Sequence, residues 1–273
     1  MAGKAKQSSD VEAASSKSSV QSLGKAFRIL EAISASETEL TLSELALAAS
    51  LDPGTTHRML NTLVDLGYVE RMENKRFGLT LKVLDLGFRA IGHRDMRMLA
   101  RPMLRSLVGE VSEAASLGVL SGSDILYVER MRAGVTRLGV DIRIGTVIPA
   151  TNSVIGWALL AFLPDAELAR VLKQDSRQTG FSAPPSAAAL RKQLTTIRKQ
   201  GYALSPSHIS NGLVVLAAPV LDQDGYPVAA ISVAAPSIRM DMDVLRARAL
   251  EAVKTVAMQI ARGLEAGGGT AAG

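Results

Sequence analysis

The chain has 273 residues and a formal net charge of +5, and it contains no cysteine. The absence of cysteine excludes disulfides, thiolate metal sites and cysteine nucleophiles, and it suits a reducing compartment. No apolar run approaches the ~18–20 residues that span a bilayer, and the polar N-terminus lacks the apolar core of a signal peptide. We therefore expect a cytoplasmic protein without a membrane partner, whose positive charge permits a polyanionic partner but does not require one.

The two ends of the chain are expected to lie outside the folded domains. Residues 1–19 are rich in Ser, Lys and Ala, and they cannot bury enough apolar surface to offset the entropy lost on ordering. Residues 266–273, AGGGTAAG, contain too few side chains to pack. We expect a disordered tail at the first end and a flexible tail at the second.

Three short helices are predicted in the first third of the chain. The first covers Leu23–Ile33, where apolar residues recur at helical spacing. Thr41 starts the second, because Glu44 three residues later completes a capping box. Asp52 caps the third, with Pro53 at its first helical position.

A β-hairpin follows the third helix. The runs YVERM and RFGLT, at residues 68–72 and 76–80, are β-like and are separated by Glu-Asn-Lys. Ser50 and Leu51 form a tight turn between the second and third helices. Three helices with such a turn, followed by a hairpin, predict a winged helix-turn-helix domain over residues 20–80.

The third helix and the hairpin carry the side chains expected to contact DNA. Between residues 41 and 80 there are four basic and five acidic residues, so the prediction rests on where the polar groups point and not on net charge. Hydroxyl, amide, imidazole and cationic groups can bond phosphates or base edges. The expected contacts are Thr55, Thr56, His57, Arg58 and Asn61 on the helix, and Lys75 and Arg76 at the tip of the wing. The alternative is a winged helix used for protein contacts.

The rest of the chain predicts a linker helix and a second domain. Residues 81–96 have the length and position of an interdomain helix, and we expect Pro102 to begin a new one. Residues 97–265 mix strand-like runs with segregated helices, which indicates an α+β domain with an antiparallel sheet. Its expected elements are the strands ASLGVLS, DILYVERM and TRLGVDI, helices near 165–173 and 186–200, an apolar hairpin of GLVVLAAPVLD and PVAAISVAAP, and a closing helix at 242–264.

These blocks, in this order, resemble the IclR family of bacterial transcriptional regulators. The resemblance runs through VQSLGKAFRILEAI, LTLSELALAASLDPGTTHRMLNTLVDLGYVER, RFGLTLKVLDLG, ASLGVLSGSDILYVER, IGTVIPATNSVIGWALLAFL, KQGYAL and NGLVVLAAPVLDQDGYPVAAISVAAP. It implies a winged helix-turn-helix, a linker helix and a GAF-like effector-binding domain. It also implies dimers through the DNA-binding half, often tetramers through the effector half, and control of a catabolic operon by a small organic acid. The chain departs from the family pattern at Ser50, where Gly is usual, and at Pro53 and Gly54.

The resemblance also places an effector pocket in the second domain. Asn152 or Ser153 is predicted to cap an apolar helix that runs to Phe162, and a helix N-terminus offers N–H groups and a positive dipole end to a carboxylate. The ligand's acid group would lie near Thr151, Asn152, Ser153, Val154 and Ile155, with Ser205, Val215, Ser232 and Ala234 as the remaining walls. The alternative is that Asn152 and Ser153 only cap their helix.

The pocket is expected to be less polar than is usual for the family. This chain has His208 where the family commonly has Glu, and Val215 where the family has Cys or Ser. It has Ala234 where the family has Ser. We therefore expect an aromatic or longer apolar acid, not glyoxylate or pyruvate. His208 would either pair with the ligand's carboxylate or be incidental.

Two other function classes find little support. An enzyme would need a nucleophile elbow, a P-loop or a dinucleotide-binding glycine motif, and none is present. The three histidines lack metal-ligand spacing, and nothing orients Ser207, His208 and Asp222 or Asp224 as a triad. A structural nucleoid-type binder would not need a large apolar second domain. We expect no catalytic residues, metal or cofactor.

Overall fold

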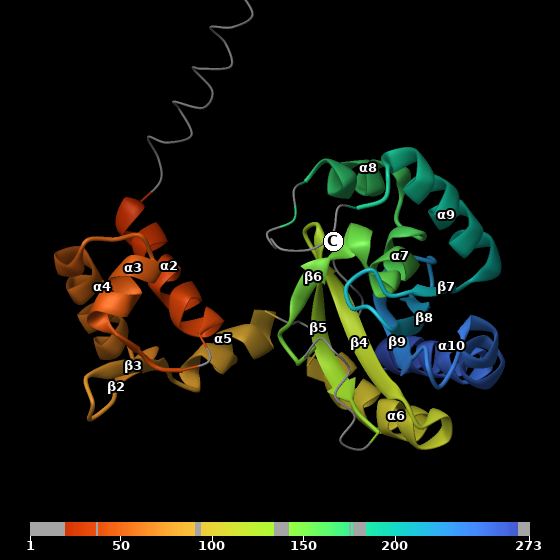
Figure 1. The fold of residues 1–273 in the computed structure, drawn as a ribbon, viewed down its shortest axis with the longest axis horizontal. Coiled ribbons are helices and arrows are strands. Elements are labelled where there is room, and N and C mark those ends of the chain that lie inside the picture. Colours follow the sequence, from red (N-terminus) through yellow and green to blue (C-terminus); the bar gives the residue numbers. More distant parts are fainter. Residues whose placement is uncertain are drawn as a thin grey trace, which may run out of the picture. The chain divides into compact units, whose positions relative to one another are not determined.

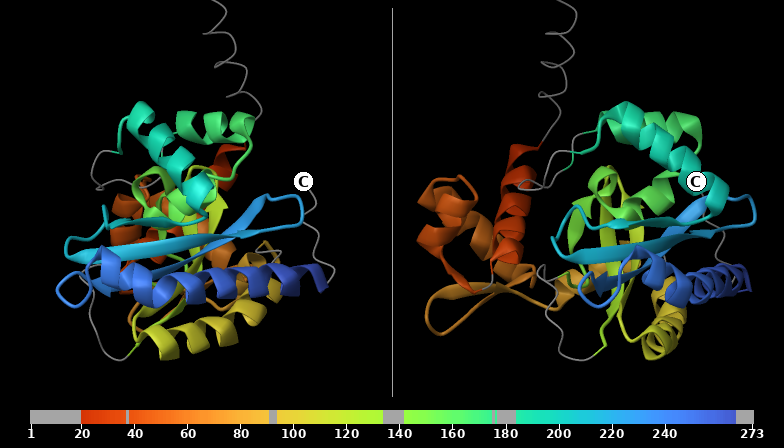
Figure 2. Two further views of the ribbon diagram at one scale, coloured as in Figure 1. Left: turned by 90° about the vertical axis from the view of Figure 1, so that its right-hand side faces the viewer. Right: turned by 45° about the vertical axis from the view of Figure 1, so that its right-hand side comes forward.

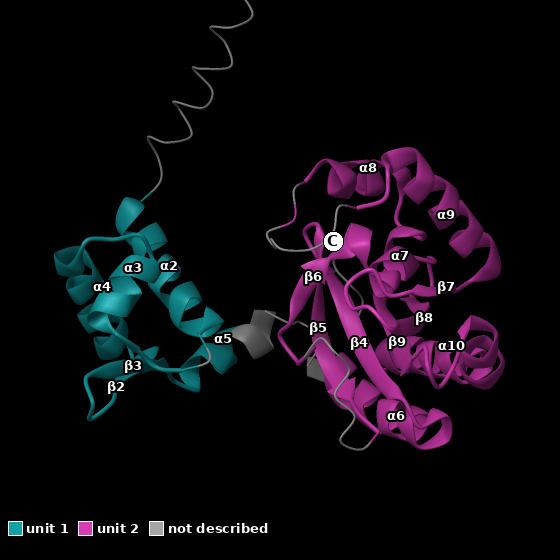
Figure 3. Ribbon diagram, viewed as in Figure 1, with its two compact units in different colours: residues 1–92 teal, residues 93–273 magenta. Residues whose placement is uncertain are grey.

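The computed structural model describes residues 20–36, 38–90, 94–133, 142–174, 176 and 184–266. The chain divides into two compact units, residues 1–92 and 93–273 (Figure 3). The expected tails lie outside the described residues, apart from Ala266 at the end of the last helix. The expected strand TRLGVDI lies outside them as well, apart from Ile142.

Unit 1 contains the three predicted helices, α2 (Gln21–Ala35), α3 (Leu42–Ala48) and α4 (Pro53–Asp65). The predicted capping box is present, since the Thr41 N–H donates to Glu44 Oε2 at 2.7 Å and the Glu44 N–H donates to Thr41 Oγ1 at 3.4 Å. Asp52 Oδ1 accepts the Thr55 N–H at 2.8 Å, which starts α4, and this bond lowers the pKa of Asp52.

The small sheet of unit 1 has one strand more than was predicted. The hairpin strands β2 (Val69–Arg71) and β3 (Arg76–Leu79) pair as expected, and β1 (Leu40–Thr41) pairs with the other edge of β3. A two-residue strand carries no periodic signal, so the sequence pattern could not show it. The helices and the sheet enclose a core that includes Ile29, Leu45, Leu60 and Phe77.

A helix pair joins the two units, and here one expectation is wrong. Helix α5 (Lys82–Ala90) ends unit 1, residues 91–93 lie outside the described part, and α6 (Arg94–Val111) begins unit 2. Pro102 lies inside α6 and does not begin a helix. Proline removes a backbone donor, which leaves the carbonyl of Met98 without its helical partner. Both Pro102 and Met98 lie on the exposed side of the helix, where water can bond that carbonyl.

Unit 2 is built on an antiparallel sheet, and the predicted α+β class is confirmed. Its described strands follow the order β6-β5-β4-β9-β8-β7, with neighbours antiparallel throughout. The strands are β4 (Ala114–Ser121), β5 (Asp124–Met131), β6 (Val147–Pro149), β7 (Ala203–Pro206), β8 (Leu213–Leu221) and β9 (Pro227–Pro236).

Helices cover both faces of this sheet (Figures 1 and 2). Helix α6 and the closing helix α10 (Met242–Ala266) pack on one face. The short helix η1 (Ala150–Asn152) and helix α7 (Val154–Leu160) lie on the other face, and α9 (Ala187–Gln200) packs over α7. Helix α8 (Asp165–Lys173) precedes α9, as predicted.

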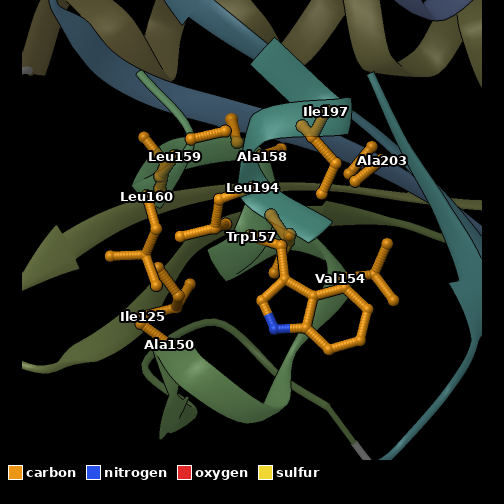
Figure 4. Close-up of a cluster of buried hydrophobic side chains, with 14 of the residues drawn as sticks. Ile125, Ala150, Val154, Trp157, Ala158, Leu159, Leu160, Leu194, Ile197 and Ala203 are labelled. Carbon is orange, nitrogen blue, oxygen red and sulfur yellow. The ribbon is translucent and has the colours of Figure 1, made fainter. Parts of the chain in front are cut away.

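The core on the α7 side is centred on Trp157 (Figure 4). Its indole is 1% exposed, and its Nε1–H donates to the Thr151 carbonyl at 2.7 Å, so the buried polar atom is satisfied. Leu194 and Ile197 of α9 and Ala203 of β7 contribute to the same cluster. This packing fixes α7 and η1 against the sheet.

A buried ion pair ties the ends of two central strands together. Glu113, just before β4, is 4% exposed, and it receives two hydrogen bonds from the guanidinium of Arg239, just after β9. The two N···O distances are 3.1 and 2.8 Å. Such a bidentate pair fixes the geometry as well as the charge.

We expect Arg239→Ala to destabilise unit 2 by about 2–3 kcal/mol, because the Glu113 carboxylate would remain buried without its partner. The matched control is Arg246→Ala, which breaks a pair whose side chains are 50% and 84% exposed and should cost about 0.5 kcal/mol or less. Urea unfolding followed by Trp157 fluorescence reports on unit 2, since the chain has one tryptophan. Equal losses in the two variants would contradict the assignment.

Candidate DNA-binding and effector-binding sites

The exposed face of α4 carries polar side chains, but not all of those that were predicted. His57, Arg58 and Asn61 are exposed, and so is Thr62, which the sequence reading did not select. Thr55 and Thr56 were expected on this face, and both are buried, at 7% and 0% exposure. They lie against the core in the first turn, where the Thr56 hydroxyl donates to the Asp52 carbonyl at 2.9 Å. Their structural role is to hold the start of the helix.

The turn between α3 and α4 requires an unusual backbone conformation. Ser50 has a φ of 52°, which lies in the left-handed region that glycine adopts at least cost. The next residue returns the chain, since the Leu51 N–H donates to the Ala46 carbonyl at 2.9 Å. Ala46 is buried at 6% exposure, which allows the two helices to approach.

The two basic residues of the wing differ in their placement. Lys75 is exposed in the β2–β3 turn, with a φ of 61°. Arg76 was expected beside it at the tip, but it begins β3 and folds back onto unit 1. Its Nη1 donates to the Glu39 carbonyl at 2.6 Å and lies 3.5 Å from Glu44 Oε2. The wing therefore offers Lys75 to a partner, while Arg76 connects β3 to the start of α3.

Unit 2 contains a cavity between its sheet and the start of α7. Its volume is about 40 Å³. The predicted residues that line it are Ser153, Val154, Ile155, His208, Val215, Ser232 and Ala234. The structure thus brings together residues that lie up to 81 positions apart, from Ser153 to Ala234.

Three predicted residues do not line this cavity. Thr151 and Asn152 belong to η1, where the Thr151 carbonyl accepts the Trp157 indole and the Thr151 hydroxyl donates to Asn152 Oδ1 at 3.3 Å. Ser205 pairs with Val215 on the edge strand β7 but stays outside the lining. These residues support the packing around the cavity.

The start of α7 differs from the expected anion site. Ser153 is the N-cap, as predicted, and its hydroxyl accepts the Gly156 N–H at 3.1 Å. The helix ends at Leu160 and not at Phe162, so it has 7 residues. A helix this short, with one first-turn donor already capped, is a weaker anion site than the sequence suggested.

Several lining residues were missed, and the strand pattern explains why. They are Tyr127, Arg130, Ile142, Ser207, Ile209, Ser210 and Leu213. Tyr127 and Arg130 are three residues apart on β5, so simple alternation places them on opposite faces. Ser207 and Ser210 belong to the loop SPSHIS, whose serines were visible as a cluster but not as part of a pocket.

A β-bulge places Tyr127 and Arg130 on the same face. Glu129 pairs with Leu117 and Tyr127 pairs with Gly118, so Val128 is an extra residue in β5. Tyr127 is buried, and burial raises the pKa of its phenol, while the nearby Arg130 partly opposes the rise. The phenol therefore stays protonated at neutral pH.

His208 lines the cavity and contacts the core. Its ring lies edge-on to Trp157, with centroids 5.0 Å apart and planes at 72°. Ser207, its neighbour, accepts the N–H groups of Ile209 and Ser210 at 3.2 and 3.1 Å. Asp222 accepts N–H groups within the β8–β9 turn, so these residues serve the loop and the turn and do not form a triad.

Comparison with known proteins identifies the chain. The family model of the IclR helix-turn-helix domain matches residues 22–73, and that of the bacterial transcriptional regulator IclR C-terminal domain matches residues 88–262. The chain belongs to the IclR family. The HTH-type transcriptional regulator KdgR of Dickeya chrysanthemi, a curated relative, is 32% identical over 227 residues, covering 82% of this chain and 74% of KdgR.

Solved structures share the whole architecture. A transcriptional regulator from Rhodococcus sp. RHA1 is 32% identical, with a TM-score of 0.75 over 91% of this chain and 99% of that one. An IclR homolog from Microbacterium hydrocarbonoxydans, solved in complex with 4-hydroxybenzoate, is 25% identical, with a TM-score of 0.77 over 90% of this chain and 99% of that one.

Membership of the IclR family settles the function class. The chain is a DNA-binding transcriptional regulator with an effector-binding domain, and it is not an enzyme, because the family is one of regulators. Among the described residues, no three His, Cys, Asp or Glu side chains are placed to hold a metal ion. None of the described helices is long and apolar enough to cross a membrane.

Gly118 sets the distance between the sheet and α7 at the cavity. A Cβ added there would lie 2.8 Å from Ile125 Cγ2 and 2.9 Å from Ile155 Cδ1. We expect Gly118→Ala to destabilise unit 2 by about 1–3 kcal/mol, because Ile155 would have to leave its position in the cavity wall.

The matched control for this substitution is Gly109→Ala in α6. An added Cβ there meets nothing within 4 Å, so the helix should gain about 1 kcal/mol or less. Urea unfolding followed by Trp157 fluorescence measures both variants. A Gly118→Ala chain as stable as the unsubstituted one would show that Ile155 is not held by the sheet.

Proposed function

We propose that this IclR-family regulator acts in the cytoplasm and binds operator DNA through α4 and the β2–β3 wing. We further propose that an organic acid with an aromatic or otherwise apolar body, bound in the cavity of unit 2, controls its operator affinity. The regulated genes would then encode catabolism of such an acid. The observation that carries this proposal is the cavity itself, which gathers residues from α7, β8, β9 and the 207–212 loop around a largely apolar wall.

The DNA-binding surface is supported by exposure and charge. Arg58 and Asn61 are three residues apart on α4, so they share one face of the helix, and both are exposed. Arginine and asparagine are the side chains that pair bidentately with guanine and adenine. Lys75 is exposed on the wing, where a cation suits backbone phosphate or the minor groove.

We expect Arg58→Ala and Asn61→Ala each to cost about 1–3 kcal/mol of operator affinity and to relax sequence preference, because they remove base-edge contacts. Lys75→Ala should weaken binding to all sequences alike and reduce the slope of log K against log salt by about 1. Fluorescence anisotropy, with a duplex selected from a random pool and with an unrelated duplex, measures both effects.

Arg76→Ala is the matched control on the same wing. Its guanidinium is held by Glu39 and Glu44, so its removal should change the salt slope less than Lys75→Ala does. If Arg58, Asn61 and Lys75 can all be replaced without loss of operator affinity, α4 and the wing do not read DNA.

The character of the cavity supports an acid with an apolar body. Its described walls include Ile142, Val154, Ile155, Ile209 and Val215, and it contains one guanidinium, that of Arg130, among the described lining residues. An IclR homolog with the same fold binds 4-hydroxybenzoate. The space open to a water molecule is about 40 Å³, so a ring-sized ligand would have to displace side chains, and binding would be coupled to a change of conformation.

The effector proposal is tested by operator affinity in the presence of candidate acids. We expect benzoate and 4-hydroxybenzoate to change operator affinity, and to raise the melting temperature of the full chain, more than glyoxylate or pyruvate does. A ligand at 100 times its Kd stabilises the native state by about 2.7 kcal/mol. Short keto acids that act more strongly than the aromatic acids would contradict the apolar pocket.

We also propose that the chain self-associates, as a dimer or tetramer. Helix α2 leaves Leu23 and Phe27 exposed at 59% and 54%, four residues apart on one face. Leu84 and Leu86 of α5 are exposed as well. An apolar surface of this kind on a regulator supports contact with a second copy of the chain.

A further inference from the structure

The floor of the cavity is a row of polar side chains on three neighbouring strands. Arg130 of β5 pairs with Ser116 of β4, and Ser116 pairs with Ser232 of β9. Directly paired residues on antiparallel strands have their Cβ atoms about 5 Å apart on the same face. Arg130, Ser116 and Ser232 therefore stand side by side, and Arg130 and Ser232 line the cavity.

Tyr127 extends this row because of the bulge at Val128. Its partner Gly118 lies two residues from Ser116 on β4, so both belong to the same face, about 7 Å apart along the strand. Tyr127 also lines the cavity. One face of the sheet thus presents a phenol, a guanidinium and a hydroxyl to the same enclosed space.

Two of these groups are hydroxyls that lie at the cavity wall without a hydrogen bond to the described part of the protein. Tyr127 and Ser232 are each 5% exposed, and within the described part of the chain neither hydroxyl makes a hydrogen bond to protein. Buried side-chain hydroxyls in native proteins nearly always have a partner. Their presence at a cavity wall points to acceptor atoms of a ligand.

Arg130 adds a charge to these donors. Its Nη1 donates to the Ser116 hydroxyl at 2.9 Å, which orients the guanidinium along the row. A guanidinium carries five N–H donors in a planar fork that matches a carboxylate. A guanidinium can therefore bond more than one acceptor group at a time.

We propose that the acid group of the ligand binds at this floor, where Arg130 pairs with the carboxylate and Tyr127 and Ser232 donate hydrogen bonds to it. The apolar body then lies toward Ile155, Ile209 and Val215, with His208 and Trp157 beyond. This inference rests on the proposed function and specifies the orientation of its ligand. It places the acid group on the sheet and not at the start of α7, where the family resemblance had placed it.

The test is calorimetric titration of the full chain with benzoate and benzamide, which share a shape and differ in charge. Arg130→Gln should weaken benzoate binding roughly 10- to 100-fold and leave benzamide binding within about threefold, because only the charged group loses its partner. Tyr127→Phe, which removes a single hydroxyl and keeps the ring, should weaken benzoate binding about three- to tenfold.

Arg191→Gln and Tyr202→Phe are the matched controls. Arg191 is exposed on α9 and Tyr202 lies before β7, and neither lines the cavity. Neither control should change the preference for benzoate over benzamide. A merely structural role of Arg130 would weaken both ligands alike, so the ratio of the two affinities separates anchoring from folding.

The outcomes are distinct. If Arg130→Gln and Tyr127→Phe bind benzoate as the unsubstituted chain does and keep its preference over benzamide, the inference is wrong while the proposed regulator stands. If Arg130→Gln fails to fold, Tyr127→Phe alone decides by whether benzoate affinity falls about three- to tenfold. If the unsubstituted chain binds no carboxylate and its operator affinity responds to none, the proposed effector and this inference both fail.

Discussion

Side chains along strand β5 alternate between the two faces of the sheet until one extra residue interrupts the alternation. Both the cavity and the contact with α6 depend on this interruption. With Val128 as an extra residue, Tyr127 and Arg130 share the cavity face of the sheet, while Glu129 lies on the α6 side. There Glu129 Oε2 accepts from Arg97 Nε at 3.0 Å, and Oε1 accepts the Arg130 N–H at 3.1 Å. One segment of four residues thus contacts both the cavity and the helix that begins unit 2.

The cavity differs from the packed core in how its polar groups are bonded, because a buried polar group without a hydrogen bond costs free energy. The Trp157 indole N–H bonds the Thr151 carbonyl and the Glu113 carboxylate bonds Arg239, so these buried polar groups have protein partners within packed core. The floor of the cavity departs from this rule, since the hydroxyls of Tyr127 and Ser232 face enclosed space. Donors placed in this way are what the proposed ligand, with its acceptor atoms, would use.

In unit 1 the hydrogen bonds at the starts of α3 and α4 decide which polar side chains are buried and which are exposed. Asp52 and the buried Thr56 fix the first turn of α4, so the exposed polar side chains of this helix begin at His57. Arg76 stabilises the junction of β1, β3 and α3, and it leaves Lys75 as the exposed cation of the two. Residues that look alike in the sequence therefore divide into those that build the domain and those that face outward.

The sequence by itself determined the main helices and strands of this protein and their order, but not the short elements β1, β6, β7 and η1. Caps at Thr41 and Asp52, helical spacing and apolar runs are local signals, so they predicted the winged helix and the antiparallel sheet, while the family followed from the resemblance of whole sequence blocks. The tertiary structure decided what depends on register and distance: the strand β1, the continuation of α6 through Pro102, the burial of Thr55 and Thr56, and the meeting of Tyr127 with Arg130. A bulge shifts side chains from one face of a strand to the other without changing the composition that a sequence pattern records.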